Sequence, residues 1–398
     1  MAEDYSKLTD EELIEKYHNA KTLAQVFDLS QMAKKILLNS CYGAIGNAYF
    51  LHNDVKIARA ITLMGQALIN KSAKKTNEYI NKVLHNDAEH SIDARVYSDT
   101  DSNYFELNQA LNKFLKVKPN ADRQEKTDFL DKFCHKIEDD CLTPLFVKIK
   151  NECNGHKDGE LHMDREAIAA PSEKTGYCGL WIAKKRYYLL LDDMEGFRYT
   201  ANGHEAHEKI MGLFSVTSTC PEFIKPYFNK VMYNLCSEGV DEARKTIKEL
   251  KDIFFHKSVA EIAFPKGVTD VDKFINPETK LPWDGEWLDN GSGKTRNGGV
   301  PINAKAAIYH NYLIDKLNLG TKYQKIKSGD KMKYVYLLEN PYKYSVIGFL
   351  DDMPEEFGLN KYVDYNTHYE KLFLSPVTDI FTACSLEVEP QASIEDFF

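Results

Sequence analysis

The sequence predicts an α+β protein, in which helices and an antiparallel sheet occupy different stretches of the chain. Three observations predict this class. Residues 55–84 repeat apolar side chains at helical spacing, residues 161–199 change to the two-residue period of strands, and a short polar hairpin stands between them. At 398 residues the chain has room for about two or three domains.

The composition is that of a globular protein with an acidic surplus. Hydrophobic residues make up 43% of the chain, charged residues make up 28%, and the formal net charge is -9. This charge argues against a general nucleic-acid coat protein, although a local basic stripe is enough for phosphate contacts. Scattered cysteines indicate free thiols in a reducing cytoplasm. No stretch approaches the roughly 20 apolar residues of a membrane span, so we expect no membrane contact.

The first 84 residues are predicted to be mostly helical. Thr9 and Glu12 have the spacing of a capping box, which begins a first helix. A second helix is predicted to begin at Asp28 and to end at Gly43, because glycine commonly follows the last helical turn. The long helix over residues 55–84 comes next.

The second of these helices carries a cation, an amide and an aromatic ring on one side. Lys35, Asn39 and Tyr42 stand at spacings that place them on one stripe. Such a stripe suits the phosphates and the base of a nucleoside triphosphate. A polar helix face that happens to carry a tyrosine would show the same pattern, so both interpretations stay open.

Asp99 and Asp101 stand at the tip of a predicted hairpin between residues 94–96 and 103–105. Two carboxylates this close repel each other unless a cation lies between them. Hard oxygen ligands suit Mg²⁺, which keeps several waters and also binds substrate phosphates. The alternative is an aspartate-rich turn whose side chains bond to their own backbone.

The stretch from residue 161 to residue 199 is predicted to form an antiparallel meander. Within it, Lys184, Lys185, Arg186 and Tyr187 lead into the most apolar strand. Three cations beside an aromatic ring suit phosphate contact together with stacking or groove contact. A solvated strand edge blunted by lysine is the alternative. The expected strands are residues 162–170, 177–183 and 186–191, with a hairpin at 192–196.

The remainder of the chain is predicted to be mainly helical and to end in a peptide with apolar anchors. Gln391, Ile394, Phe397 and Phe398 could place one amide and three apolar side chains into the groove of a partner protein. A disordered acidic tail is the alternative. Helices are expected over residues 222–236, 240–255, 304–317 and 364–374, a strand over 331–338, and loops over 265–301.

Three motifs in a fixed order resemble the polymerase motifs of family-B DNA polymerases, particularly those of T-even-like bacteriophages. They are Lys-x-x-x-Asn-Ser-x-Tyr-Gly from Lys35, Tyr-x-Asp-Thr-Asp-Ser from Tyr97, and Lys-Lys-Arg-Tyr from Lys184. Shorter stretches at residues 163–168, 209–212 and 392–398 also look like that group. The resemblance covers nearly the whole chain and is weakest over its first 25 residues.

The resemblance implies the C-terminal part of a right-hand polymerase fold. Its antiparallel-sheet palm would be joined by a mainly helical thumb. The implied domains are the C-terminal fingers helices (1–46), the palm (47–204), the thumb (205–385) and a tail with a sliding-clamp-binding peptide (386–398).

The same resemblance implies roles for individual residues and for ligands. Lys35, Asn39 and Tyr42 would hold the incoming deoxynucleoside triphosphate. Asp101 would ligate two Mg²⁺ ions, with Asp99 beside it and Glu166 as an acidic neighbour. Primer–template DNA and the sliding clamp would be held by the residues that follow: Ser102, Lys184, Lys185, Arg186 and Tyr187 for the DNA, and Gln391, Ile394, Phe397 and Phe398 for the clamp.

The departures from the family pattern are decisive. The family's other essential aspartate lies in Asp-x-x-Ser-Leu-Tyr-Pro, and the chain contains no Ser-Leu-Tyr-Pro. The first fingers helix and the exonuclease carboxylate motifs are also missing. We therefore expect one subunit of a split polymerase in the host cytoplasm, active with an N-terminal partner that supplies the missing aspartate and exonuclease. A non-catalytic DNA- and clamp-binding module and an artificial truncation are the alternatives.

Overall fold

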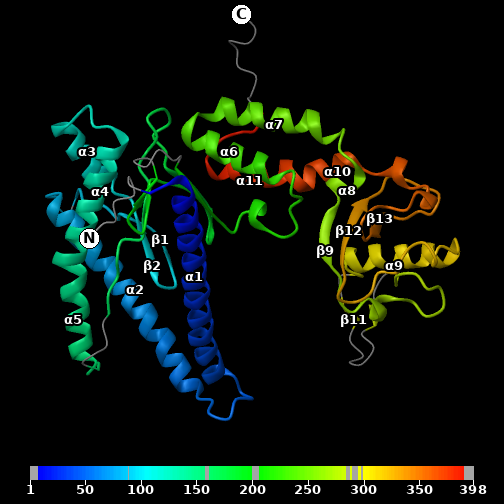
Figure 1. The fold of residues 1–398 in the computed structure, drawn as a ribbon, viewed down its shortest axis with the longest axis horizontal. Coiled ribbons are helices and arrows are strands. Elements are labelled where there is room, and N and C mark those ends of the chain that lie inside the picture. The colour runs from blue at the N-terminus through cyan, green and yellow to red at the C-terminus, as the bar shows by residue number, and fades with distance from the viewer. Residues whose placement is uncertain are drawn as a thin grey trace, which may run out of the picture. The chain divides into compact units, whose positions relative to one another are not determined.

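The computed structural model describes residues 8–87, 89–156, 161–199, 206–283, 287–288, 295–296 and 299–389. Helices and small antiparallel sheets make up these residues, which confirms the α+β class (Figure 1). The chain divides into two compact units, Met1–Lys113 with His135–Met163, and Phe114–Cys134 with Asp164–Phe398. The predicted boundaries of fingers, palm, thumb and tail stay predictions. None of the described helices is both long and apolar enough to cross a membrane.

Helix α1 (Asp10–Gly46) begins the first unit as one continuous helix. Its capping box is confirmed, because the backbone N–H of Thr9 donates to Glu12 Oε2 at 2.9 Å and that of Glu12 donates to Thr9 Oγ1 at 3.3 Å. The prediction of a new helix at Asp28 is wrong. No glycine or proline interrupts residues 13–42, so the helix continues through Asp28.

Helix α2 (Val55–Val83) follows a short turn and confirms the predicted long helix. The carboxylate of Asp54 caps it by accepting the backbone N–H groups of Lys56 at 2.8 Å and Ile57 at 3.2 Å. Its side chains Ala73 and Ile80 are buried in the unit's core. Helix α2 also contacts the π-helical turn Glu138–Leu142, which precedes α5.

The predicted hairpin is confirmed as strands β1 (Arg95–Asp99) and β2 (Ser102–Phe105), which pair antiparallel. Helix α2 contacts both strands. The amide of Asn103 donates to the hydroxyl of Ser72 at 3.1 Å and to the carbonyl of Ile69 at 3.3 Å. These bonds fix the hairpin against the middle of α2.

The stretch from residue 167 to residue 211 in the second unit contains two three-stranded sheets. The prediction of one meander is therefore wrong in detail, although every pairing is antiparallel. The predicted strand at residues 162–170 shrinks to two residues. Past its C-terminal end the Asp192 carboxylate accepts the backbone N–H of Ala170 at 2.6 Å in place of a ladder bond. The sheets are β4 (Gly179–Ala183), β5 (Arg186–Leu191) and β8 (His207–Met211), and β3 (Ala167–Ile168), β6 (Asp193–Met194) and β7 (Phe197–Arg198).

The remaining elements confirm most of the helices predicted for the C-terminal half. Buried aromatic rings, among them Phe228, Phe254, Phe373 and Phe381, form one continuous core there. Strand β12 (Lys331–Tyr336) confirms the strand predicted over residues 331–338. It pairs antiparallel with β9 (Phe264–Gly267) and β13 (Val346–Phe349) in a further three-stranded sheet, and β9 begins just before the predicted loop region.

The helices and strands not yet given have the following bounds. The helices are α3 (Asn108–Val117), α4 (Arg123–Ile137), α5 (Thr143–Glu152), α6 (Lys225–Ser237), α7 (Val240–Phe254), α8 (Val259–Ile262), α9 (Ile302–Lys316), α10 (Tyr365–Tyr369) and α11 (Ser375–Ala383). The strands are β9 (Phe264–Gly267), β10 (Trp287–Leu288), β11 (Thr295–Arg296), β12 (Lys331–Tyr336) and β13 (Val346–Phe349).

Candidate active site

Thr100 and Asp101 form the two-residue loop of the hairpin, because Asp99 pairs with Ser102. Thr100 has a φ of 53°, which lies in the left-handed region that β-branched residues rarely occupy. The backbone N–H of Asp101 donates to the carbonyl oxygen of Asp99 at 2.6 Å, and the hydroxyl of Ser102 donates to the same oxygen at 3.2 Å. The tip is therefore tightly held, with Asp101 exposed and Asp99 half-buried.

The carboxylates of this tip could hold a divalent cation together with ligands from other molecules. Within the residues that the structure describes, no group of three or more His, Cys, Asp or Glu side chains could hold a metal ion. Mg²⁺ commonly takes one or two carboxylates from a protein and completes its shell with water and substrate phosphates. Asp99 and Asp101 fit that share. Part of the alternative turn bonding is present as well, because the Thr100 hydroxyl donates to the Asp99 carboxylate at 3.1 Å.

Lys35, Asn39 and Tyr42 occupy one side of α1, in the same unit as the hairpin. All three side chains are exposed, and Tyr42 keeps 41% of its surface in contact with solvent. Neighbouring Ser40 turns its hydroxyl back to the carbonyl of Ile36 at 2.7 Å. The predicted stripe is therefore open to a ligand.

Glu166 lies in the second unit, immediately before β3, and it already has a cationic partner. Lys209 Nζ, from β8, donates to Glu166 Oε1 at 2.7 Å. The carbonyl of Glu166 also accepts the backbone N–H of Glu195 at 2.6 Å. This ion pair balances the charge of Glu166 without a metal ion.

Lys184 and Lys185 form the turn between β4 and β5, where Lys185 has a φ of 62°. Both lysines are exposed, whereas Tyr187 keeps only 5% of its surface exposed. The Tyr187 ring packs on Trp181 with a centroid distance of 4.6 Å, so it supports the turn from within. Arg186 lies 4.0 Å from the carboxylate of Asp379 in α11.

Comparisons with known proteins decide what these motifs belong to. The family model for DNA polymerase family B matches residues 11–138, which contain α1, α2 and the hairpin. The DNA-directed DNA polymerase of Enterobacteria phage T4 is 27% identical over 401 residues, covering 99% of this chain and 41% of its own length. That of Escherichia phage RB69 is 28% identical over 403 residues, covering 100% and 41%. This chain is similar to the family-B DNA polymerases.

The similarity to family-B DNA polymerases extends beyond phages and covers only part of each longer protein. The DNA polymerase catalytic subunit of Saimiriine herpesvirus 2 (strain 11) is 24% identical over 255 residues, which cover 62% of this chain and 20% of that protein. The chain spans about two fifths of the length of the two phage polymerases. The family model includes Lys35, Asn39, Tyr42, Asp99 and Asp101, whereas Glu166 and Lys184–Tyr187 lie outside its match.

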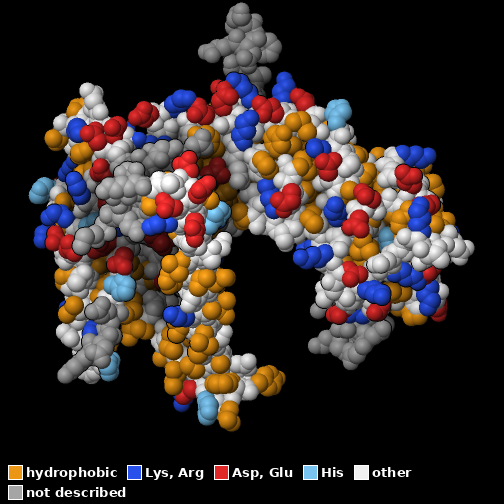
Figure 2. Space-filling view, in the orientation of Figure 1, with side chains coloured by type: hydrophobic (Ala, Val, Ile, Leu, Met, Phe, Trp, Pro, Cys, Tyr) orange, Lys and Arg blue, Asp and Glu red, His pale blue; other side chains and the backbone are white. Residues whose placement is uncertain are grey.

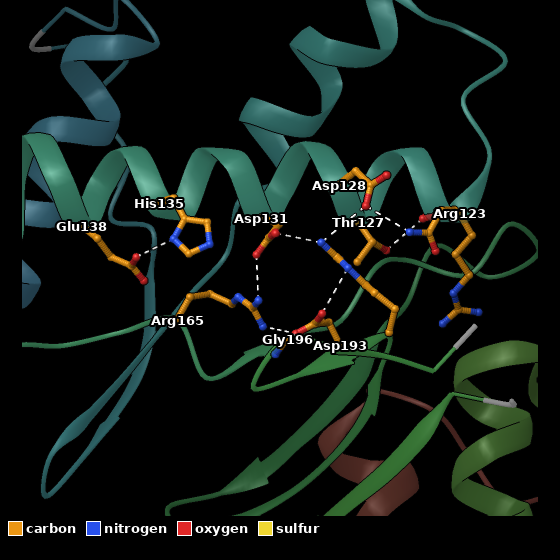
Figure 3. A network of polar contacts seen from close by, with 11 residues as sticks. Arg123, Thr127, Asp128, Asp131, His135, Glu138, Arg165, Asp193 and Gly196 are labelled. Atoms are coloured by element: carbon orange, nitrogen blue, oxygen red, sulfur yellow. Dashed lines mark hydrogen bonds and ion pairs between the residues drawn. The ribbon is translucent and has the colours of Figure 1, made fainter. Parts of the chain in front are cut away.

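An ionic network next to Glu166, which no sequence pattern indicated, surrounds the buried Asp193 (Figure 3). Asp131 of α4 accepts from Arg165 Nη2 and from Arg198 Nη2, both at 2.8 Å. Asp193 is fully buried and pairs with the same two arginines, with Arg198 Nε at 3.1 Å. The network ties α4 to the sheet of β3, β6 and β7, and it fixes the backbone on both sides of Glu166.

Gly212 makes a close backbone contact that the sequence analysis did not predict. Its φ is 62°, and a Cβ built there would lie 2.1 Å from the carbonyl oxygen of Lys185. Only glycine fits such an approach. The glycine that ends the stretch at residues 209–212 was the available signal.

The predicted clamp-binding residues Gln391, Ile394, Phe397 and Phe398 lie outside the described residues.

Proposed function

We propose that this chain is the C-terminal part of a family-B DNA polymerase and extends a primer once the rest of the polymerase is supplied. The observation that carries the proposal is the Asp99–Asp101 pair, held on a tight hairpin inside the range that the family model matches. The left-handed Thr100 between them adds support, because strained residues at loop tips cluster at functional sites.

The proposed reaction joins the primer 3′-oxygen to the α-phosphorus of a deoxynucleoside triphosphate. The bond from that phosphorus to the bridging oxygen breaks, pyrophosphate leaves, and the hydroxyl proton passes to solvent. Two Mg²⁺ ions, when bound, supply activation of the hydroxyl and neutralisation of the leaving group. Asp101 would hold both ions, and Asp99 would lie beside them. Glu166 would be an acidic neighbour, kept in place by Lys209.

The other motifs would position the substrates, which accounts for much of the catalysis in such transfers. Lys35 would neutralise the triphosphate, Asn39 would lie by the base, and Tyr42 would test the nascent pair from the minor groove. Their exposure on α1 supports these roles. The exposed turn of Lys184 and Lys185 would hold the primer phosphates, with Ser102, Arg186 and Tyr187 assisting.

The reaction would require a second polypeptide. The chain has no Asp-x-x-Ser-Leu-Tyr-Pro sequence. About three fifths of each phage polymerase has no counterpart in this chain. That N-terminal partner would supply the missing aspartate and the exonuclease. Residues 391–398 would recruit a sliding clamp, and the complex would work in the cytoplasm of an infected host cell.

Primer extension tests the proposal most simply. The chain and a polypeptide from the same genome that carries Asp-x-x-Ser-Leu-Tyr-Pro are assayed separately and mixed, with Mg²⁺, a primer–template and deoxynucleoside triphosphates. We expect extension only in the mixture. Equal extension by this chain alone would refute the need for a partner. Binding of primer–template without extension in the mixture would favour the non-catalytic binding module.

A further inference from the structure

Helix α1 carries an unusual load of exposed apolar side chains. None of its residues is buried in the described structure. In Figure 2 hydrophobic side chains cover most of the lower half of this helix. The large exposed ones are Ile14, Tyr17, Leu23, Val26, Phe27, Leu29, Met32, Ile36, Leu37, Leu38 and Tyr42.

We propose that α1 is the docking surface for the N-terminal polymerase polypeptide, through the side that Val26, Leu29 and Leu37 occupy. The identity of this partner rests on the proposed function. This side of α1 is distinct from the side proposed to bind the nucleotide, because a helix turns about 100° per residue. These three positions fall within about a quarter of the circumference, opposite the side of Lys35, Asn39 and Tyr42.

The sequence of α1 shows that it needs cover from another polypeptide segment. Its apolar residues follow no single stripe from Leu23 onward, and a helix that is apolar all round is normally buried. From Thr22 to Gly46 the only charged residues are Asp28, Lys34 and Lys35. Depletion of charge marks the core of a protein interface.

The described part of this chain does not supply that cover. Helix α2 approaches α1 at the connecting turn, where the backbone N–H of Asp54 donates to the carbonyl of Ile45 at 2.9 Å. Val26, Leu29 and Leu37 stay 54%, 71% and 64% exposed. Helix α1 is long enough to cross a membrane, but no stretch of it is apolar enough to do so. A protein surface is therefore the fitting occupant.

The comparisons supply the reason to choose a polymerase segment over a second copy. The family model for DNA polymerase family B matches α1 from residue 11 onward, so this helix lies inside the polymerase-like part of the chain. About three fifths of each phage relative has no counterpart in this chain. A polypeptide that corresponds to this remaining part would be large enough to cover α1. Helix α1 has 37 residues and is the longest helix described.

A binding measurement with matched variants tests the docking surface. The double variant Leu29→Gln/Leu37→Gln keeps strong helix formers and removes two apolar anchors. Its control, Leu338→Gln, makes the same change at a side chain that is 52% exposed in the second unit. Analytical ultracentrifugation measures the dissociation constant for the polypeptide from the same genome that carries Asp-x-x-Ser-Leu-Tyr-Pro.

We expect the double variant to weaken the complex at least tenfold and the control to leave it unchanged. Amide exchange over residues 22–46 should slow when the partner binds the unmodified chain. Circular dichroism verifies that the variant keeps its helices. If it does not, Val26→Gln takes its place. Equal dissociation constants for variant and unmodified chain would overturn the proposal, as would a genome that encodes no such polypeptide.

Two further outcomes would assign the surface to another occupant and overturn the proposal. One is self-association of the chain alone that the double variant abolishes. The other is flotation of the chain with phosphatidylcholine–phosphatidylglycerol vesicles. A complex that depends on α1 but never extends a primer would sink the proposed function and leave the docking surface intact. Primer extension that the double variant and the control support equally would overturn the docking surface and leave the proposed function intact.

Discussion

Gly212 lies so close to Lys185 that a side chain at position 212 would begin 2.1 Å from the Lys185 carbonyl oxygen. This approach joins the end of β8 to the turn between β4 and β5. Both residues have left-handed backbones, with φ of 62°. The position of the basic turn thus depends on a residue without a side chain.

Gly212→Ala should displace the basic turn. We expect a loss of about 1–3 kcal/mol in the free energy of unfolding, because the alanine meets backbone atoms and a strained φ. Affinity for a primer–template should fall, and its dependence on salt concentration should become shallower as lysine–phosphate contacts are lost. Fluorescence anisotropy at several salt concentrations measures both. Gly320→Ala, where a Cβ meets nothing within 4 Å, is the control.

Asp193→Asn should destabilise the second unit strongly. The fully buried carboxylate pairs with Arg165 and Arg198, whose side chains are only 8% and 17% exposed, so removing its charge leaves both arginines without full compensation. Losses of about 3–5 kcal/mol are typical of such changes. Urea unfolding measures the effect. Asp379→Asn, which affects an exposed pair at 4.0 Å, should change stability by less than about 1 kcal/mol. Similar losses in both variants would contradict the structural role of the network.

His368 should make stability sensitive to mild acid. Its buried ring accepts the backbone N–H of Tyr336 at Nε2 (2.8 Å) and donates from Nδ1 to the carbonyl of Ile262 (3.0 Å), which requires the neutral form. Burial lowers the pKa of His368 from 6.5 to about 4. Between these values the unfolded chain binds the proton and the folded chain does not, so stability is full above 6.5 and falls as the pH drops toward 4.

The measurement is urea unfolding at pH 7 and pH 5. We expect the titration of His368 to lower the free energy of unfolding of the unmodified chain by about 2 kcal/mol between pH 7 and pH 5. His368→Gln removes the titration, so its loss over the same interval should be smaller by that amount. An equal loss in the two proteins would show that His368 stays uninvolved in the acid sensitivity.

The sequence predicts those parts of this structure that local patterns determine. The hairpin around Asp99 and Asp101, the helix from Val55 and the capping box at Thr9 all depend on neighbouring residues, and the structure contains each of them. The false helix start at Asp28 has a local cause as well. A good capping residue does not begin a new helix where nothing ends the previous one.

Long-range contacts account for what the sequence could not predict. Arg123 pairs with Asp192 across 69 positions, and Arg198 reaches Asp131 across 67. No periodicity or spacing links such residues. The same holds for Lys209, which pairs with Glu166 across 43 positions and neutralises a residue predicted to face a metal ion. The division of the predicted meander into two sheets likewise depends on strand pairings that no local pattern indicates.

The most direct test of the proposed polymerase function is the rate of primer extension by Asp101→Asn in the mixture with the N-terminal polypeptide. We expect a loss of at least about a thousandfold, because an exposed carboxylate at the hairpin tip is replaced without a change of shape. Asp351→Asn, another exposed aspartate, should extend the primer at the unmodified rate. An Asp101→Asn mixture that matches this control would contradict the proposed metal site.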